Sequence, residues 1–203
     1  MPEYLNEDYA TIAGDLVFPN VQSCCAMVVT TTQNNSLGGF HLTIGTKRDA
    51  FDRVLSQLKT MMVGTVDGVY LVGNVLGRGN NVTSGLTYPG PLKAAIAAGL
   101  AYGFGVKYHD IGNNNPGVAV HAWRDPGRNT LQLTISNQGS WAVAGLVQPA
   151  PGMVKVVGQD DLLPRTGGPT YSQVSLLRPP AGGVRSCTLN ANTPLSPFTM
   201  LTF

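Results

Sequence analysis

The chain has few charged residues and no long apolar run, and each shortage excludes a class of protein. Only 12% of its 203 residues are charged, while 43% are hydrophobic, which argues against an intrinsically disordered chain. The net charge is +2 and like charges do not form runs, so nothing indicates a nucleic-acid surface. No apolar stretch approaches the roughly 18 residues of a membrane-spanning helix, and we expect no contact with a membrane.

Cysteine is also scarce: the chain has three, of which Cys24 and Cys25 are adjacent. Adjacent cysteines rarely pair because the geometry is strained, so reduced thiols are expected instead of a disulfide scaffold. The acidic residues 1–8 lack the basic and apolar regions of a signal peptide. The sequence therefore predicts a cytoplasmic protein, or one delivered outside the cell without a Sec-type signal.

The order of hydrophobic patterns predicts an α/β (α+β) fold. Residues 25–32 and 40–44 flank a polar turn and predict a β-hairpin. Apolar residues at helical spacing predict a helix over 48–62, and Pro91 favours a second helix that ends near residue 102. Further strands are expected at 16–18, 68–75, 106–111, 118–123 and 131–136. We therefore expect a mixed β-sheet core with two helices packed on one face and the other face partly open.

The last third of the chain has a different pattern. Short β-like pieces at 141–147, 153–157, 171–177 and 198–203 are separated by segments rich in proline and glycine. We find no repeat and no linker. The sequence therefore predicts a single domain over 1–203, with a core at 16–136 and a β-rich C-terminal extension at 137–203.

The strongest chemical feature is Ser23-Cys24-Cys25 on one hairpin strand and Gly38-Gly39-Phe40-His41 on the other. A thiol becomes a good nucleophile when a base within hydrogen-bond reach accepts its proton. Strand alternation separates His41 from the apolar Phe40, so we expect His41 on a polar face or in a cleft. The pattern predicts a catalytic pair of Cys24 or Cys25 with His41. The alternative interpretation is that both cysteines are buried core residues.

The same residues resemble a known signature. Ser23-Cys24, a small residue at 26, apolar residues at 27–29 and Gly38-Gly39-x-His41 are similar to the motif of the chemotaxis receptor glutamine deamidases. The order of the later elements is also similar. Deamidating toxins of the cytotoxic necrotizing factor and Burkholderia lethal factor type share this arrangement, with the nucleophile in a Leu-Ser-Gly-Cys motif. Alignment on Ser-Cys makes Cys24 the nucleophile, and alignment on the toxin motif makes it Cys25.

The resemblance covers roughly residues 16–125 and implies deamidation of glutamine in a protein substrate. The thiolate would attack the carboxamide, and His41 would protonate the leaving ammonia and then activate water. No metal or organic cofactor is required. Both families often carry a threonine six residues before the cysteine, where this chain has Phe18 or Pro19; a backbone carbonyl can orient the histidine instead.

Several alternatives stay open. The added C-terminal third favours a toxin or effector that modifies a target protein, and a chemotaxis receptor-type deamidase is the near alternative. Another cysteine hydrolase and a non-enzymatic protein-binding module are the competing classes. His109 and His121 could face each other across a 106–123 hairpin, but with Asp110 they form too sparse a ligand set for a metal, and we interpret them as structural. Cys187 is expected to be a structural thiol.

Overall fold

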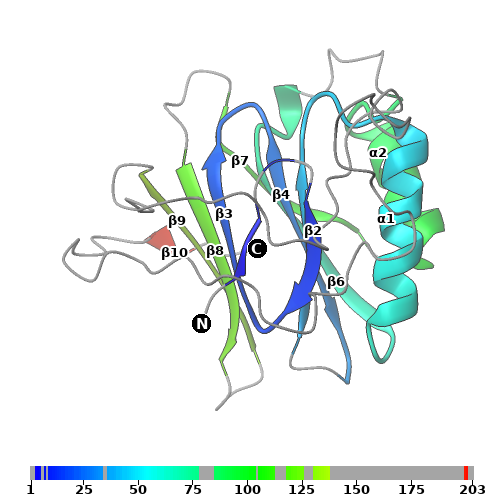
Figure 1. Ribbon diagram of the computed structural model, residues 1–203. Helices are drawn as coiled ribbons and strands as arrows, with labels where there is room; N and C mark the ends of the chain where they lie inside the picture. The colour runs from blue at the N-terminus through cyan, green and yellow to red at the C-terminus, as the bar shows by residue number, and fades with distance from the viewer. Residues whose placement is uncertain are drawn as a thin grey trace, which may run out of the picture.

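The computed structural model has three layers: two β-sheets packed face to face, and two helices that cover the outer face of one sheet (Figure 1). It describes residues 3–5, 7, 9–33, 36–77, 85–103, 105–112, 118–125, 130–137 and 199–200. The elements are β1 (Glu3–Tyr4), β2 (Ala10–Ala13), β3 (Asp15–Val21), β4 (Cys25–Thr31), β5 (Leu37–Leu42), α1 (Arg48–Met61), β6 (Val66–Gly73), α2 (Gly90–Leu100), β7 (Lys107–Asp110), β8 (Val118–Asp125), β9 (Thr130–Asn137) and β10 (Thr199–Met200).

The helices pack on the sheet of order β2-β5-β4-β6-β7, and the other sheet has the order β1-β3-β8-β9-β10. The predicted mixed α/β fold with two helices on one face is confirmed. The expected open face is wrong, because the second sheet covers it (Figure 1). The physical reason lies in β4, which is buried at all seven positions. A strand that is apolar on both faces needs cover on both.

Strand alternation divides the core into two clusters. Met27 and Val29 of β4 face the helices and join the helix-facing core, whereas Ala26 and Val28 face the second sheet and join the inter-sheet core. Phe18 of β3 also lies in the inter-sheet core. The candidate site lies where the inter-sheet core meets one end of β4.

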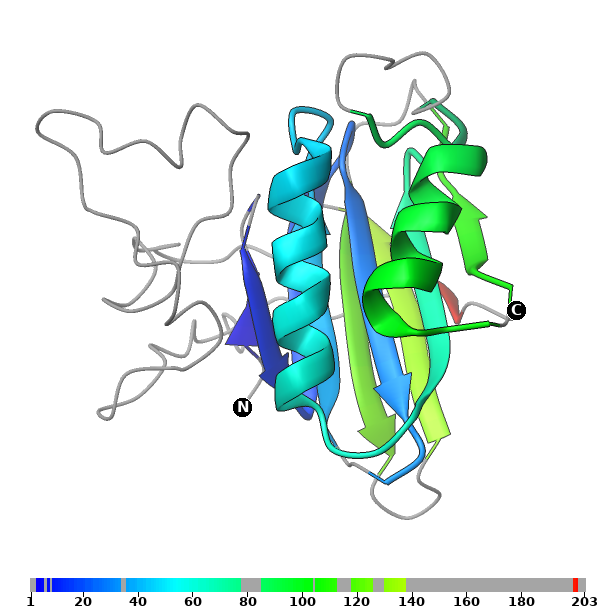
Figure 2. The same ribbon diagram turned by 90° about the vertical axis from the view of Figure 1, so that its right-hand side faces the viewer.

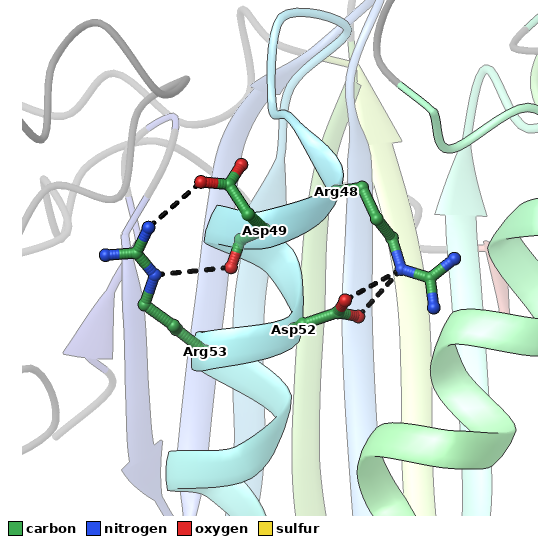
Figure 3. A network of polar contacts seen from close by, with 4 residues as sticks. All are labelled: Arg48, Asp49, Asp52 and Arg53. Atoms are coloured by element: carbon green, nitrogen blue, oxygen red, sulfur yellow. Dashed lines mark hydrogen bonds and ion pairs between the residues drawn. The ribbon is translucent and has the colours of Figure 1, made fainter.

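Helix α1 is held mainly by its apolar face. Arg48 pairs with Asp52 and Arg53 with Asp49 on its outer surface, at 2.8 and 2.9 Å (Figure 3). These four side chains are 39–44% exposed, so each pair contributes only about 0.3–0.5 kcal/mol. The buried face instead presents five apolar residues to the core: Ala50, Phe51, Val54, Leu55 and Leu58.

The two helices lie side by side over the sheet (Figure 2). A Cβ at Gly99 of α2 would lie 2.6 Å from Cβ of Leu55 in α1. The absence of a side chain at Gly99 therefore allows the helix backbones to approach closely. Both predicted helices are confirmed, with ends at most two residues from the expected bounds. Within the described ranges, no helix has the length and apolar character needed to cross a membrane.

The predicted 106–123 hairpin is wrong. Strand β7 pairs in parallel with β6 in the helix-backed sheet, and β8 pairs with β3 and β9 in the other sheet. His109 and His121 therefore lie in different sheets. Local alternation of polarity cannot distinguish pairing between neighbouring segments from pairing with distant strands.

The predicted extension over 137–203 falls mostly outside the described residues. The expected β pieces at 141–147, 153–157 and 171–177 lie there, as does Cys187. Of the piece at 198–203, Thr199 and Met200 form β10 beside β9. The division into a core at 16–136 and an extension within one domain stays a prediction.

Candidate functional site

Cys25 is the first residue of β4 and faces the helices. It lies opposite Leu42 in β5 and Gly73 in β6, and its side chain is fully buried in the helix-facing core. His41 lies opposite Ala26, on the other side of the sheet. The structure therefore does not bring Cys25 and His41 together. Within the described residues, neither Cys25 nor Cys24 forms a disulfide.

His41 is fully buried between the two sheets, so the expected polar face or cleft at this position is wrong. The second sheet and Phe18 cover it, with the Phe18 ring edge-on at a centroid distance of 6.0 Å. Its Nδ1 lies 2.8 Å from the carbonyl oxygen of Leu5. Because a carbonyl can only accept, Nδ1 carries the proton and Nε2 is the basic nitrogen. Nε2 is buried and has no hydrogen-bond partner among the described residues.

A backbone carbonyl thus orients His41. The sequence allowed for this, because the chain has Phe18 or Pro19 where the deamidase motif often has a threonine. This carbonyl belongs to the N-terminal segment that contains Leu5, Glu7 and Tyr9. The segment is fixed on both sides of Glu7. Before it, the amide of Leu5 donates to the carbonyl of Val17 at 2.8 Å, and after it, the carbonyl of Tyr9 accepts from the amide of His41 at 2.9 Å.

At Gly38 and Gly39, the glycines of the motif, neighbouring side chains pack closely against the backbone on opposite faces of β5. A Cβ at Gly39 would lie 2.6 Å from Leu5 Cδ1, and one at Gly38 would lie 2.7 Å from Met62 Sδ. Gly39 therefore makes room for the leucine that anchors the N-terminal segment, and Gly38 makes room below α1. The leucine beside Gly39 is also the residue whose carbonyl contacts His41.

Cys24 immediately precedes β4 and is only 3% exposed. It lies two residues before Ala26, which is paired with His41. Its Sγ donates to Glu7 Oε1 at 3.4 Å and lies 3.8 Å from Ser23 Oγ. Within the described part of the chain, no hydrogen bond joins Sγ to His41. Its carbonyl accepts from the amide of Asn74 at 3.0 Å, which fixes the backbone at this point.

The electrostatics of the site favour neutral groups. Burial, and then the charge of Glu7, raise the pKa of Cys24 to about 12. Burial also lowers the pKa of His41, although the Leu5 carbonyl and the Glu7 charge act in the opposite direction. Near pH 7 the resting site therefore holds a thiol and a neutral imidazole, with one carboxylate acting on both.

The other candidate residues lie elsewhere. His121 Nε2 contacts Asp15 Oδ1 at 2.6 Å, and its ring stacks on Trp123, so it links β8 to β3. Asp110 Oδ1 accepts from the amide of Leu76 at 2.9 Å. In the described ranges, no three histidine, cysteine or acidic side chains converge on one point.

Sequence reasoning missed Glu7 and the Leu5 carbonyl because residues 1–8 looked like a polar start. The only signal in the sequence is that Leu5 and Tyr9 are spaced apolar residues within this acidic segment. No protein-family model matches the chain, and no curated protein matches it. The resemblance to glutamine deamidases therefore stays a prediction, which depends on the residues between Ser23 and His41 and on the expected order of elements.

Proposed function

We propose that the protein is a cysteine-dependent protein glutamine deamidase, a hydrolase that converts glutamine to glutamate in a target protein and releases ammonia. The observation that carries this proposal is that the Glu7 carboxylate contacts Cys24 and acts on both Cys24 and His41. A potential nucleophile and a carboxylate thus contact each other at one end of β4, and the carboxylate also acts on the buried imidazole of His41. Cys24 is the proposed nucleophile, since Cys25 points into the helix-facing core.

The reaction begins when Cys24 Sγ attacks the carboxamide carbon. The ladder pairs of β4 begin at Cys25, so the backbone amides of Ser23 and Cys24 precede the ladder and are the proposed donors to the oxyanion. The C–N bond then breaks and the departing nitrogen takes up the proton that the thiol released, so that ammonia leaves. Water hydrolyses the thioester while Nε2 of His41 accepts a proton from it, and the sulfur is protonated again when the C–S bond breaks. The chemistry needs no metal or organic cofactor.

The rim of the site supports a polypeptide substrate. Ile44 follows β5 and Leu76 follows β6, beside the strand ends that flank Cys25, and they are 41% and 51% exposed. Exposed apolar side chains suit contact with another protein better than with free glutamine. We favour a toxin or effector acting on a target protein, with a chemotaxis receptor-type deamidase as the alternative.

The raised pKa and low exposure of Cys24 favour a second candidate function, a non-enzymatic protein-binding module. A neutral, covered thiol is a poor nucleophile. The two functions differ in whether the thiol ever loses its proton. A deamidase needs a group that accepts this proton during the attack.

The test incubates the full chain with the native proteins of a cell extract and follows ammonia release and glutamine-to-glutamate conversion by mass spectrometry. We expect Cys24→Ser to abolish conversion and Cys25→Ser to retain it, with circular dichroism confirming that both variants fold. Loss of activity in Cys25→Ser alone would refute the assignment. No conversion by the wild type would favour the binding module, and incorporation of an added primary amine would indicate a transglutaminase-like enzyme.

A further inference from the structure

We infer that Glu7 is a catalytic residue whose carboxylate accepts the Cys24 proton during the attack and delivers it to the leaving ammonia. The inference rests on the proposed deamidase function and names a residue that the related motif does not contain.

The contacts of the resting site identify Glu7 as the acceptor. Its Oε1 lies 3.4 Å from Cys24 Sγ, and an ionised carboxylate can only accept a hydrogen bond, so the thiol proton points toward Glu7. His41 makes no hydrogen bond to the thiol in the described residues, and its Nδ1 is already committed to the Leu5 carbonyl. Ser23 Oγ is farther from the sulfur, at 3.8 Å, and a hydroxyl is a weaker acceptor than a carboxylate, so Glu7 is the favoured acceptor of the proton.

Leu5 and Tyr9, the described residues nearest to Glu7 in sequence, are held in place while the Glu7 side chain stays exposed. Leu5 is fully buried, and the bonds of Leu5 to Val17 and of Tyr9 to His41 fix the segment on both sides. Glu7 itself is exposed to solvent. The exposed Glu7 carboxylate therefore lies beside Cys24, a residue that is only 3% exposed, and can keep its contact with the thiol during the attack.

The proton balance closes over the two halves of the reaction. In the first half, the Sγ electron pair forms the S–C bond, the thiol proton passes to Glu7, and the carbonyl electrons move to oxygen. The carbonyl then re-forms, the C–N bond breaks, and its electron pair takes the proton from Glu7, so that ammonia leaves and Glu7 is again ionised. In the second half, His41 takes a proton from the attacking water, and the sulfur recovers it when the C–S bond breaks.

The test compares Glu7→Gln, Glu7→Asp and the control Asp52→Asn, which removes an exposed carboxylate from α1. Two rates are measured: deamidation in the cell extract, and iodoacetamide labelling of Cys24 at pH 8, mapped by peptide mass spectrometry. Glu7→Gln keeps the shape of the side chain and removes the base. We expect its deamidation to fall about 100-fold or more, with partial recovery in Glu7→Asp and no change in Asp52→Asn.

We expect Cys24 labelling to respond in the opposite sense. Removal of the Glu7 charge lowers the pKa of the thiol, so Glu7→Gln should label several-fold faster than the wild type. A structural loosening of the N-terminal segment alone would not produce a fall in deamidation together with recovery by aspartate.

The outcomes separate the two proposals. One outcome is that Cys24→Ser is inactive while the deamidation rate of Glu7→Gln stays within about threefold of the wild-type rate, well short of the loss expected for a catalytic base. In that case the proposed role of Glu7 is wrong and the deamidase proposal stands. If the wild type deamidates nothing, the proposed function fails and the catalytic role of Glu7 fails with it. An unchanged labelling rate in Glu7→Gln would also refute the contact on which the inference depends.

Discussion

Replacement of Gly39 with alanine is expected to lower the free energy of unfolding by about 2–3 kcal/mol. The new Cβ would lie 2.6 Å from Leu5 Cδ1, 2.7 Å from Leu16 Cδ1 and 3.2 Å from Phe18 Cζ. All three side chains are fully buried, so none can move without disturbing the inter-sheet core. Overpacking of this kind costs about 1–3 kcal/mol, and expulsion of Leu5 into water would cost about 1.5–3 kcal/mol.

The assay is urea denaturation followed by circular dichroism, with Gly45→Ala as the matched control. At the exposed Gly45 the nearest contact of a new Cβ is Thr43 Oγ1 at 3.8 Å, so we expect a change within about 0.5 kcal/mol. Because the Leu5 carbonyl orients His41, Gly39→Ala should also reduce deamidation, whereas Gly45→Ala should not.

A double-mutant cycle identifies Leu5 as the residue that is displaced. Leu5→Ala alone should cost about 2–5 kcal/mol because it opens a cavity. In the combined variant the methyl group at position 39 occupies part of that space, so the loss should be smaller than the sum of the single losses by about 1 kcal/mol or more. Additive losses, or a Gly39→Ala loss no larger than that of Gly45→Ala, would refute the proposed packing.

Three further predictions concern the backbone, the histidine and the surface. Gly73→Ala should lower the free energy of unfolding by more than about 2 kcal/mol, because φ is +147° and the new Cβ would lie 2.3 Å from the Cys24 carbonyl oxygen. Gly112 also has a positive φ, but a new Cβ there would meet nothing within 4 Å. Gly112→Ala should therefore cost only the backbone strain of about 1–2 kcal/mol. Burial lowers the pKa of His41 below 6.5, so the imidazole binds a proton more readily in the unfolded state than in the folded state. The free energy of unfolding should therefore fall as the pH drops below 6.5, by up to about 1.4 kcal/mol per pH unit. The fall should be less steep in His41→Gln. Asp49→Asn should cost about 0.5 kcal/mol, more than Asp52→Asn, because Asp49 lies in the first turn of α1 and precedes its arginine partner.

Each of these has a contradicting result in the same denaturation assay. Equal losses in Gly73→Ala and Gly112→Ala would contradict crowding against Cys24. Identical acid dependence of unfolding in the wild type and His41→Gln would contradict a buried neutral imidazole. A larger loss in Asp52→Asn than in Asp49→Asn would contradict the ranking of the two ion pairs.

Local patterns in the sequence predicted the elements whose partners are close in the chain. The hairpin of β4 and β5 and both helices follow from alternation, helical spacing and turn residues, because these signals act over a few residues. The second sheet did not follow, because β3 pairs with β8 about a hundred residues away, and local patterns do not specify such a partner.

The site shows the same division. Alternation correctly separated His41 from Phe40 and Leu42, yet it could not choose between Cys24 and Cys25, since that choice depends on the residue at which β4 begins. Glu7 was beyond prediction because its contact with Cys24 depends on the anchoring of Leu5 and Tyr9 to other strands. A single exposed glutamate carries no signal of its own in a sequence.

The most direct test of the central claim, that Cys24 attacks the glutamine side chain, uses a short peptide in which a diazoketone replaces the glutamine carboxamide. Reaction with the full chain, followed by peptide mass spectrometry, locates the alkylated sulfur. We predict an adduct at Cys24 that is lost in Cys24→Ser and retained in Cys25→Ser. An adduct at Cys25, or none at Cys24 under conditions in which the peptide alkylates free cysteine, would contradict the claim.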